Sequence, residues 1–130
     1  MALFDGVQLP PGETGRAVRL YLEAQDRKDF TGAEEFFHDD VLFNGLVLKA
    51  NGRDEVAGGI ESFAQNVIDW IRLEAISQSE TGAVSSVLAL YWIKLRPAAE
   101  PQVVCDHLTI RNGRIARIDN VFDLGKVPVM

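Results

Sequence analysis

The spacing of apolar residues changes about halfway along the chain. In the first half they recur every three or four positions, as Ala17, Leu20, Tyr21 and Ala24 do, and this period is typical of an amphipathic helix. From Ile71 onward, apolar and polar residues alternate in short runs that end at glycine, asparagine or proline, which is typical of strands joined by turns. Helices followed by an antiparallel sheet predict an α+β fold.

The pattern divides the chain into the following elements. Residues 1–12 form a lead-in arm and residues 123–130 a short tail. We expect one helix from Thr14, a short one capped by Asp29 or Thr31 that ends at residue 37, and one over residues 53–70. We expect strands over residues 41–48 (interrupted by a turn or bulge at Asn44-Gly45), 71–80, 83–95, 101–110 and 114–122. No repeat or linker separates these elements, so residues 1–130 are expected to form a single domain.

Composition excludes several classes of protein. The 130 residues are 47% hydrophobic and 25% charged, as in an ordinary globular domain. The net charge is −6, and the basic residues are scattered, so neither nucleic acid nor an anionic membrane is an expected partner. The single cysteine, Cys105, cannot form an intrachain disulfide. With no signal-peptide pattern and no apolar run of about 20 residues, we expect a cytoplasmic protein.

A carboxylate interrupts the predicted strand over residues 101–110. Asp106 shares one face of that strand with Val104 and Leu108, while His107 points the other way. An aspartate on an apolar face is strongly unfavourable unless it is hydrogen-bonded or held protonated. Asp106 therefore has either a structural hydrogen bond or a chemical role as a general acid or base, and the sequence leaves both open.

Other residues are candidates for the same site. Tyr21 lies in the middle of the apolar face of its helix, so it either donates to Asp106 or to a developing oxyanion, or is a core tyrosine. Asn120 alternates with two apolar neighbours, which predicts an inward amide. Asn44 either orients a substrate carbonyl or a water molecule, or only stabilises the turn in which it lies. The aromatic candidates belong either to the core or to a pocket wall. The expected substrate-binding residues are Asn120, Asn44, Trp92, Phe63, Ile118 and Phe122.

No pattern points to a metal or a cofactor. The histidines, His38 and His107, have no partners at metal-ligand spacing. There is no glycine-rich phosphate loop and no nucleophile elbow. The sequence therefore predicts chemistry that uses side chains alone.

Several short motifs follow one another in an order typical of one superfamily. They are Tyr21-Leu22-Glu23-Ala24 with Asp29, Phe37-His38-Asp39-Asp40-Val41, Gly52-Arg53-Asp54, Asp106-His107-Leu108-Thr109-Ile110, and Asn112-Gly113-Arg114-Ile115. Over roughly residues 16–124 the chain resembles the nuclear transport factor superfamily, and within it the SnoaL-like polyketide cyclases and ketosteroid isomerases. The resemblance implies a cone in which a curved, mostly antiparallel sheet wraps around N-terminal helices and encloses an apolar pocket. It also implies a homodimer formed through the outer face of the sheet.

The resemblance suggests roles for individual residues. In ketosteroid isomerases a helix tyrosine and a protonated aspartate form an oxyanion hole, and Tyr21 and Asp106 stand at those positions. The position of their general base is Gly45 here, which disfavours the usual steroid isomerase route. SnoaL-like cyclases use the mid-strand aspartate itself as acid and base, a role open to Asp106. Limonene epoxide hydrolases need an arginine between two acids, and here Asn120 replaces one of those acids, so that branch is disfavoured.

The sequence thus predicts a small enzyme without a cofactor that isomerises or cyclises a polyketide-like or steroid-like carbonyl compound. Proton transfer occurs at Asp106, assisted by Tyr21 and Asn120. Two alternatives stay open: a non-catalytic binder of an apolar small molecule, and a limonene-type epoxide hydrolase with an altered set of acids. The expected partners are a hydrophobic small molecule and a second copy of the chain.

Overall fold

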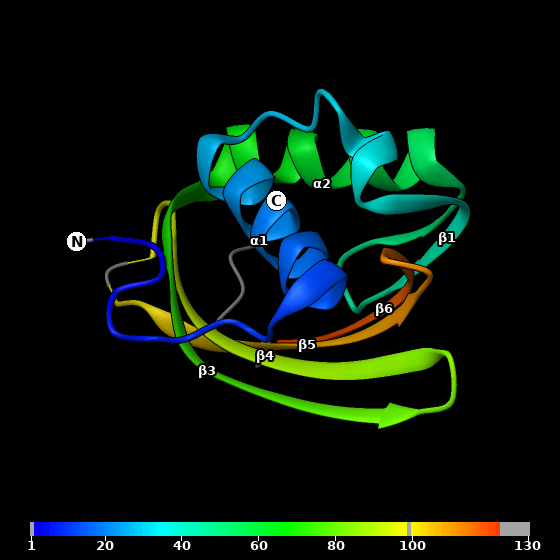
Figure 1. The fold of residues 1–130 in the computed structure, drawn as a ribbon. Coiled ribbons are helices and arrows are strands. Elements are labelled where there is room, and N and C mark those ends of the chain that lie inside the picture. Colours follow the sequence, from blue (N-terminus) through cyan, green and yellow to red (C-terminus); the bar gives the residue numbers. More distant parts are fainter. Residues whose placement is uncertain (1, 99, 123–130) are drawn as a thin grey trace.

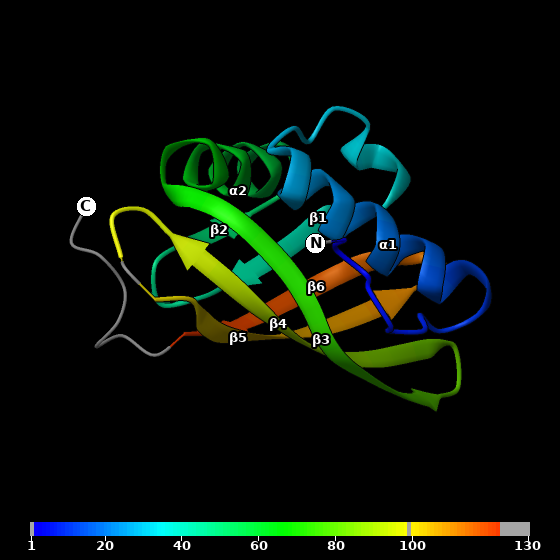
Figure 2. The ribbon, with the colours of Figure 1, turned by 90° about the vertical axis from the view of Figure 1, so that its left-hand side faces the viewer.

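The computed structural model describes residues 2–98 and 100–122, and these form an α+β fold (Figures 1 and 2). Six strands make one curved sheet in the order β2-β1-β6-β5-β4-β3. Strand β1 runs parallel to β6, and every other neighbouring pair is antiparallel. The two α-helices lie on the concave side of the sheet. The predicted fold class, a cone with a mostly antiparallel sheet, is confirmed.

The elements have these bounds: α1 Gly12–Arg27, a 3₁₀ turn η1 Ala33–Glu35, β1 Phe37–Asn44, β2 Lys49–Asn51, α2 Arg53–Val67, β3 Ile68–Thr81, β4 Val84–Leu95, β5 Gln102–Arg111 and β6 Arg114–Val121. The predicted tail over residues 123–130 lies outside the described residues. Ahead of α1, the lead-in arm packs on the core through four partly buried side chains: Leu3, Phe4, Val7 and Leu9.

Three local predictions are wrong. The short helix expected after Asp29 is only the turn η1, because Phe36 and Phe37 are drawn into the core and β1 begins at residue 37. The next helix ends at Val67 instead of residue 70, since Ile68 already pairs with Leu95 of β4. The strand expected over residues 41–48 has different bounds, since β1 covers Phe37–Asn44, whereas the turn predicted at Asn44-Gly45 is present and joins β1 to β2, with the Gly45 N–H donating to the Leu48 carbonyl at 2.9 Å.

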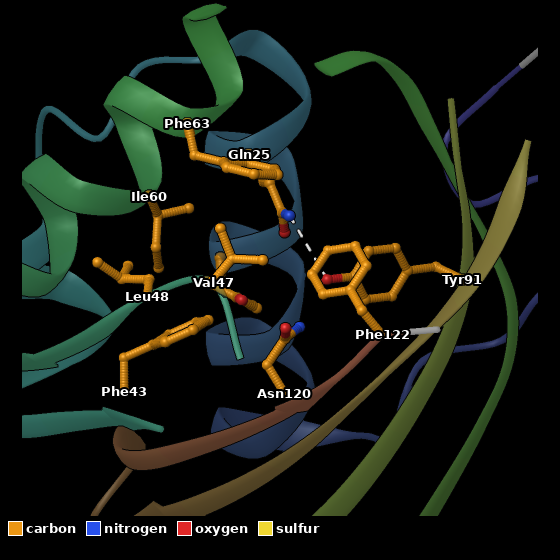
Figure 3. A pocket seen from close by; sticks show the side chains of 10 residues that line it. Gln25, Phe43, Val47, Leu48, Ile60, Phe63, Tyr91, Asn120 and Phe122 are labelled. Carbon is orange, nitrogen blue, oxygen red and sulfur yellow. Dashed lines mark hydrogen bonds between the residues drawn. The ribbon is translucent and has the colours of Figure 1, made fainter. Parts of the chain in front are cut away.

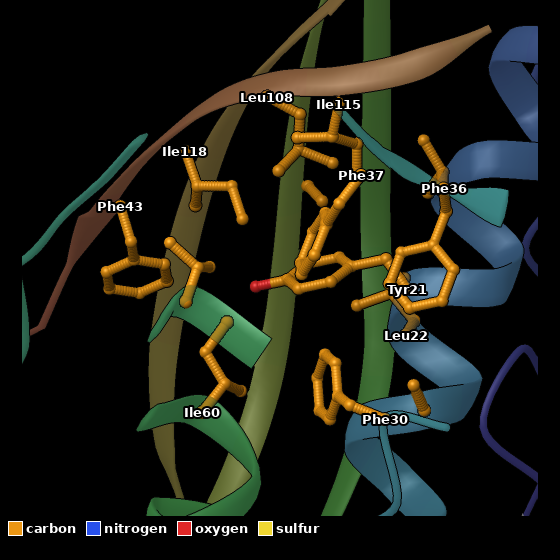
Figure 4. Close-up of a cluster of buried hydrophobic side chains, with 14 of the residues drawn as sticks. Tyr21, Leu22, Phe30, Phe36, Phe37, Phe43, Ile60, Leu108, Ile115 and Ile118 are labelled. Carbon is orange, nitrogen blue, oxygen red and sulfur yellow. The ribbon is translucent and has the colours of Figure 1, made fainter. Parts of the chain in front are cut away.

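The core fills the space between the helices and the concave face. Helix α1 buries one stripe that includes Ala17, Val18 and Leu22, and it ends at Lys28, which adopts the left-handed conformation with φ 62°. Tyr21 lies in this core among the rings of Phe30 and Phe37, with ring centroids 6.4 and 5.9 Å away (Figure 4). The core therefore fixes the tyrosine ring and leaves only its hydroxyl to be placed by hydrogen bonding.

Candidate active site

A single carboxyl group lies at the centre of the concave face. Asp106 has no exposed surface, and three neutral groups donate hydrogen bonds to it. The hydroxyls of Tyr21 and Tyr91 donate to Oδ2 at 3.0 and 2.9 Å, and Asn120 Nδ2 donates to Oδ1 at 2.5 Å. The two oxygens therefore have partners without any positive charge.

The sheet register explains how these groups meet. Asp106 of β5 stands directly opposite Asn120 of β6 and Ala89 of β4. Tyr91 lies two residues beyond Ala89, so it occupies the same face and is a diagonal neighbour of Asp106. Tyr21 reaches the carboxyl from α1 across the core.

The surroundings of Asp106 favour its neutral form. Burial raises the pKa of the Asp106 carboxyl above its ordinary value, and the hydrogen bonds from Asn120, Tyr91 and Tyr21 act in the opposite direction without cancelling the effect. Burial, followed by the charge of Asp106, raises the pKa of both tyrosine hydroxyls well above the ordinary value. The tyrosines are therefore neutral donors, and the carboxyl is the group of this network that more readily gains or loses a proton.

A pocket opens beside this network (Figure 3). Its lining residues are Tyr21, Gln25, Phe43, Val47, Leu48, Ile60, Phe63, Tyr91, Asn120 and Phe122. The cavity is about 30 Å³, enough for one or two water molecules but far below the roughly 300 Å³ of a typical ligand site. Phe63 and Phe122 contact each other, with ring centroids 6.3 Å apart. A ligand must therefore displace some of these side chains on entry.

Asp106 itself does not line the pocket. The hydroxyls of Tyr21 and Tyr91 and the amide of Asn120 stand between the carboxyl and the cavity. None of the described lining residues is acidic or basic. Any proton exchanged between Asp106 and a ligand must therefore pass through one of these three groups.

Gly45, which the resemblance places at the position of the ketosteroid isomerase base, has no room for a side chain. A Cβ there would lie 2.8 Å from the Phe43 ring and 3.2 Å from the Leu48 carbonyl oxygen. The tight turn between β1 and β2 causes this crowding. No second carboxylate of the described residues supplies a base at that position.

The structure separates the predicted substrate-binding residues into two groups. Asn120, Phe63 and Phe122 line the pocket. Trp92 does not, because it alternates with inward Tyr91 and points to the outer face, where its Nε1 donates to Glu74 at 3.2 Å. Asn44 is also outside the pocket, since its Nδ2 donates to Asp119 at 3.1 Å.

Ile118 is likewise not a lining residue. It is fully buried in the core, as Figure 4 shows, and does not reach the cavity. The pattern of alternating apolar residues in β6 indicated its inward direction but could not tell core from pocket wall.

Two polar residues of the site were missed from sequence. Tyr91 shares its face with Ala89 and Ile93, and this alternation was the signal that it points inward. Gln25 lies four residues after Tyr21 on the buried stripe of α1, and a polar residue at that position was the second signal. Gln25 Nε2 donates to the Tyr91 hydroxyl at 3.4 Å, so the network extends to the far side of the pocket.

The comparisons with known proteins agree with the fold. The model of the SnoaL-like domain matches residues 18–118. The chain therefore belongs to the SnoaL-like domain family, and the resemblance stated from sequence is confirmed. This family includes isomerases and cyclases. No curated protein matches the sequence.

Solved structures share the fold at low identity. A steroid delta-isomerase from Pseudomonas aeruginosa is 15% identical, with a TM-score of 0.73 over 92% of this chain and 87% of that chain. An NTF2-like protein of unknown function from Burkholderia pseudomallei is 21% identical, with a TM-score of 0.67 over 88% and 94%. TerC, co-crystallized with polyporic acid, is 18% identical, with a TM-score of 0.66 over 88% and 94%. At these identities the likeness establishes the fold alone.

The described residues contain neither a cluster of metal-binding side chains nor a membrane-spanning helix. No group of three or more histidine, cysteine, aspartate or glutamate side chains there is placed to hold a metal ion. None of the helices in the same part of the chain is long and apolar enough to cross a membrane.

Proposed function

We propose that this protein is an enzyme without a cofactor that isomerises or cyclises a hydrophobic, polyketide-like or steroid-like carbonyl compound by proton transfer to and from Asp106. One observation carries the proposal. Asp106 is a buried carboxyl with no cationic partner among the described residues, and two tyrosine hydroxyls connect it to the pocket. Because no cation holds it as an anion, this carboxyl can change its protonation state during a reaction.

Tyr21 is the residue through which the proton passes. In the ionised form of Asp106, the Tyr21 oxygen takes a proton from the carbon beside the substrate carbonyl while the tyrosine's own proton moves to Asp106 Oδ2, 3.0 Å away. Asn120 Nδ2 gives one N–H to Asp106 and has a second for the enolate oxygen. In an isomerisation the proton returns to a different carbon. In a cyclisation the enolate carbon bonds to a second carbonyl carbon, and the proton goes to the new alkoxide.

A non-catalytic binder is the second candidate, and the small apolar pocket beside a carboxyl that does not line it favours that function. The limonene-type epoxide hydrolase lacks comparable support. No arginine is among the described lining residues, and an asparagine, Asn120, stands opposite Asp106.

Isotope exchange tests the proposal. In heavy water we expect the protein to accelerate deuterium uptake at the carbon beside the carbonyl of para-hydroxyacetophenone and of larger aryl ketones, as measured by mass spectrometry. Asp106→Asn should reduce this rate by about 100-fold or more, since general acid–base catalysis contributes on that scale. Asp119→Asn, on the outer face, is the matched control and should exchange normally. A folded Asp106→Asn protein with an unchanged rate would refute the proposal, and ligand binding without exchange by the unsubstituted protein would favour the binder.

We also propose that the protein forms a homodimer through the outer face of the sheet. This face carries large apolar side chains in contact with solvent: Leu88, Val103 and Val121 are 49, 38 and 61% exposed. They belong to the three neighbouring strands β4, β5 and β6 and lie on the same, outer face of the sheet. An apolar surface of this kind on a small domain is typical of an interface.

A further inference from the structure

Gln25 presents an unused hydrogen-bond acceptor at the pocket. The residue is 5% exposed and lines the cavity. Its Nε2 donates to the Tyr91 hydroxyl, but its Oε1 is buried and has no hydrogen-bond partner in the described part of the chain. A buried polar atom without a partner is unfavourable because its lost hydrogen bonds to water are not replaced. Such an atom in a pocket wall is expected to meet a donor from whatever the pocket holds.

Tyr91 determines which way the Gln25 amide points. The tyrosine hydroxyl has a single proton, and it donates this proton to Asp106 Oδ2 at 2.9 Å. Its oxygen can then only accept a hydrogen bond from Gln25, so the Gln25 nitrogen faces Tyr91 and the Gln25 oxygen is left free. The free atom is therefore an acceptor, and it suits a ligand hydroxyl better than a second ligand carbonyl.

We propose that Gln25 Oε1 is a ligand-binding acceptor and that the ligand of this pocket carries a hydroxyl group in addition to its carbonyl group. The carbonyl part rests on the proposed function, and the hydroxyl part is new. Gln25 follows Tyr21 by one helical turn on α1, a rise of about 6 Å. Gln25, Tyr91, Asp106 and Tyr21 are joined by three consecutive hydrogen bonds. One compact hydroxylated ketone or enolised diketone can therefore reach both ends of the site.

A trapped water molecule is the alternative donor to Gln25, and Gln102 provides a control for it. Gln102 is 4% exposed and its Oε1 also has no partner among the residues that the structure describes, but it does not line the pocket. A purely structural role predicts similar behaviour for the two glutamines. A ligand-binding role predicts that Gln25 alone affects the selectivity between ligands.

The experiment compares para-hydroxyacetophenone with para-fluoroacetophenone, whose fluorine is close in size to a hydroxyl but donates no hydrogen bond. We expect the unsubstituted protein to bind the hydroxylated ketone about tenfold more tightly by calorimetric titration, equivalent to about 1.4 kcal/mol. Gln25→Met should bring this ratio close to one by weakening only the hydroxylated ketone. Gln102→Met should leave the ratio unchanged.

Three results would overturn the inference: equal affinity of the unsubstituted protein for the two ketones, no binding of the hydroxylated ketone, or a ratio that survives Gln25→Met. If Gln25→Met does not fold, the side-chain amide signal of Gln25 in the unsubstituted protein replaces it, and this signal should shift with the hydroxylated ketone alone. The ratio is independent of deuterium exchange. A tenfold difference in affinity without deuterium exchange would support this inference and contradict the proposed function. Deuterium exchange with equal affinities for the two ketones would support the proposed function and contradict this inference.

Discussion

Asp106 and Asp119 lie on neighbouring strands of one sheet, but they face opposite sides and have opposite electrostatics. Asp106 faces the core, and its hydrogen-bond donors in the described part of the chain are all neutral. Asp119 faces outward and binds the Arg117 guanidinium, with Nε 2.9 Å from Oδ2. Burial raises the pKa of the Asp106 carboxyl, whereas the hydrogen bond from Arg117 lowers the pKa of the Asp119 carboxyl.

The difference shows what makes one of two aspartates suitable for chemistry. An exposed carboxylate next to a guanidinium stays ionised over the whole physiological range. A buried carboxyl among hydroxyls and amides has no such constraint, and it can store a proton and release it. The inner face of β5 and β6 is therefore suited to be an active site because its carboxyl group is buried among neutral groups, whereas the carboxylate on the outer face is paired with an arginine.

The largest contrast is expected when each aspartate is replaced by leucine. Asp106→Leu leaves Tyr21, Tyr91 and Asn120 without their acceptor, and each buried donor without a partner costs roughly 1–3 kcal/mol. We expect the free energy of unfolding to fall by about 3 kcal/mol or more in urea denaturation. Asp119→Leu should change it by less than about 1 kcal/mol, because it removes a partly exposed ion pair. Equal losses would contradict the comparison.

A smaller contrast is expected in the dependence of stability on pH. The pKa of Asp106 is higher in the folded than in the unfolded protein, so folding takes up a proton. The contribution of Asp106 protonation to the free energy of unfolding is therefore full below the pKa of the unfolded protein, about 3.9, and is lost as pH rises through the pKa of the folded protein. Asp119 has a lowered pKa, so its contribution is present above the unfolded value and is lost as pH falls through the folded value.

Urea denaturation at several pH values, with Asp106→Asn and Asp119→Asn beside the unsubstituted protein, measures both contributions. We expect the advantage of the unsubstituted protein over Asp106→Asn to shrink as pH rises, by about 1.4 kcal/mol for each unit of pKa shift. Its advantage over Asp119→Asn should shrink as pH falls, with a total below about 1 kcal/mol. Slopes of the same sign for the two variants would show that the carboxyls do not differ as described.

The smallest effect on the activity of the pocket is expected from a substitution on the outer face of the sheet. Val103→Glu places a charge in the exposed apolar surface of β5. We expect it to convert a dimer into a monomer in light scattering after size-exclusion chromatography, while deuterium exchange at the pocket continues. The unsubstituted protein running as a monomer would contradict the proposed interface, and loss of exchange in a folded variant would show that the two faces are coupled.

Much of the fold follows from local patterns, and the errors occur where tertiary contacts override them. The helix from Thr14, the start of the next helix at Arg53 and the four long strands were predicted because period and turn residues agree there. The stretch around Phe36 and Phe37 reads as a helix in isolation but is drawn into the core beside Ile115, whose N–H donates to the Phe36 carbonyl at 2.8 Å.

The site was predictable to a similar extent. Asp106 was found because a charge on an apolar face is conspicuous, and Asn120 because it alternates with apolar neighbours. Tyr91 and Gln25 were missed because an amphipathic residue on a buried face needs no explanation until its hydroxyl or amide is placed. Trp92 was grouped with the other aromatic residues as core or pocket wall, although its position in the strand puts it on the other face.

The distance along the chain between the parts of the site has a consequence for its assembly during folding. The Tyr21–Asp106 hydrogen bond spans 85 residues, and the parallel pairing of β1 with β6 brings Phe43 beside Ile118. Contacts this distant in sequence require closing a long loop and form slowly. A partly synthesised chain that has α1 and β1 but not β6 contains neither Asn120 nor Phe122. The pocket is therefore among the last features to form, and a ligand that binds it stabilises only the completed fold.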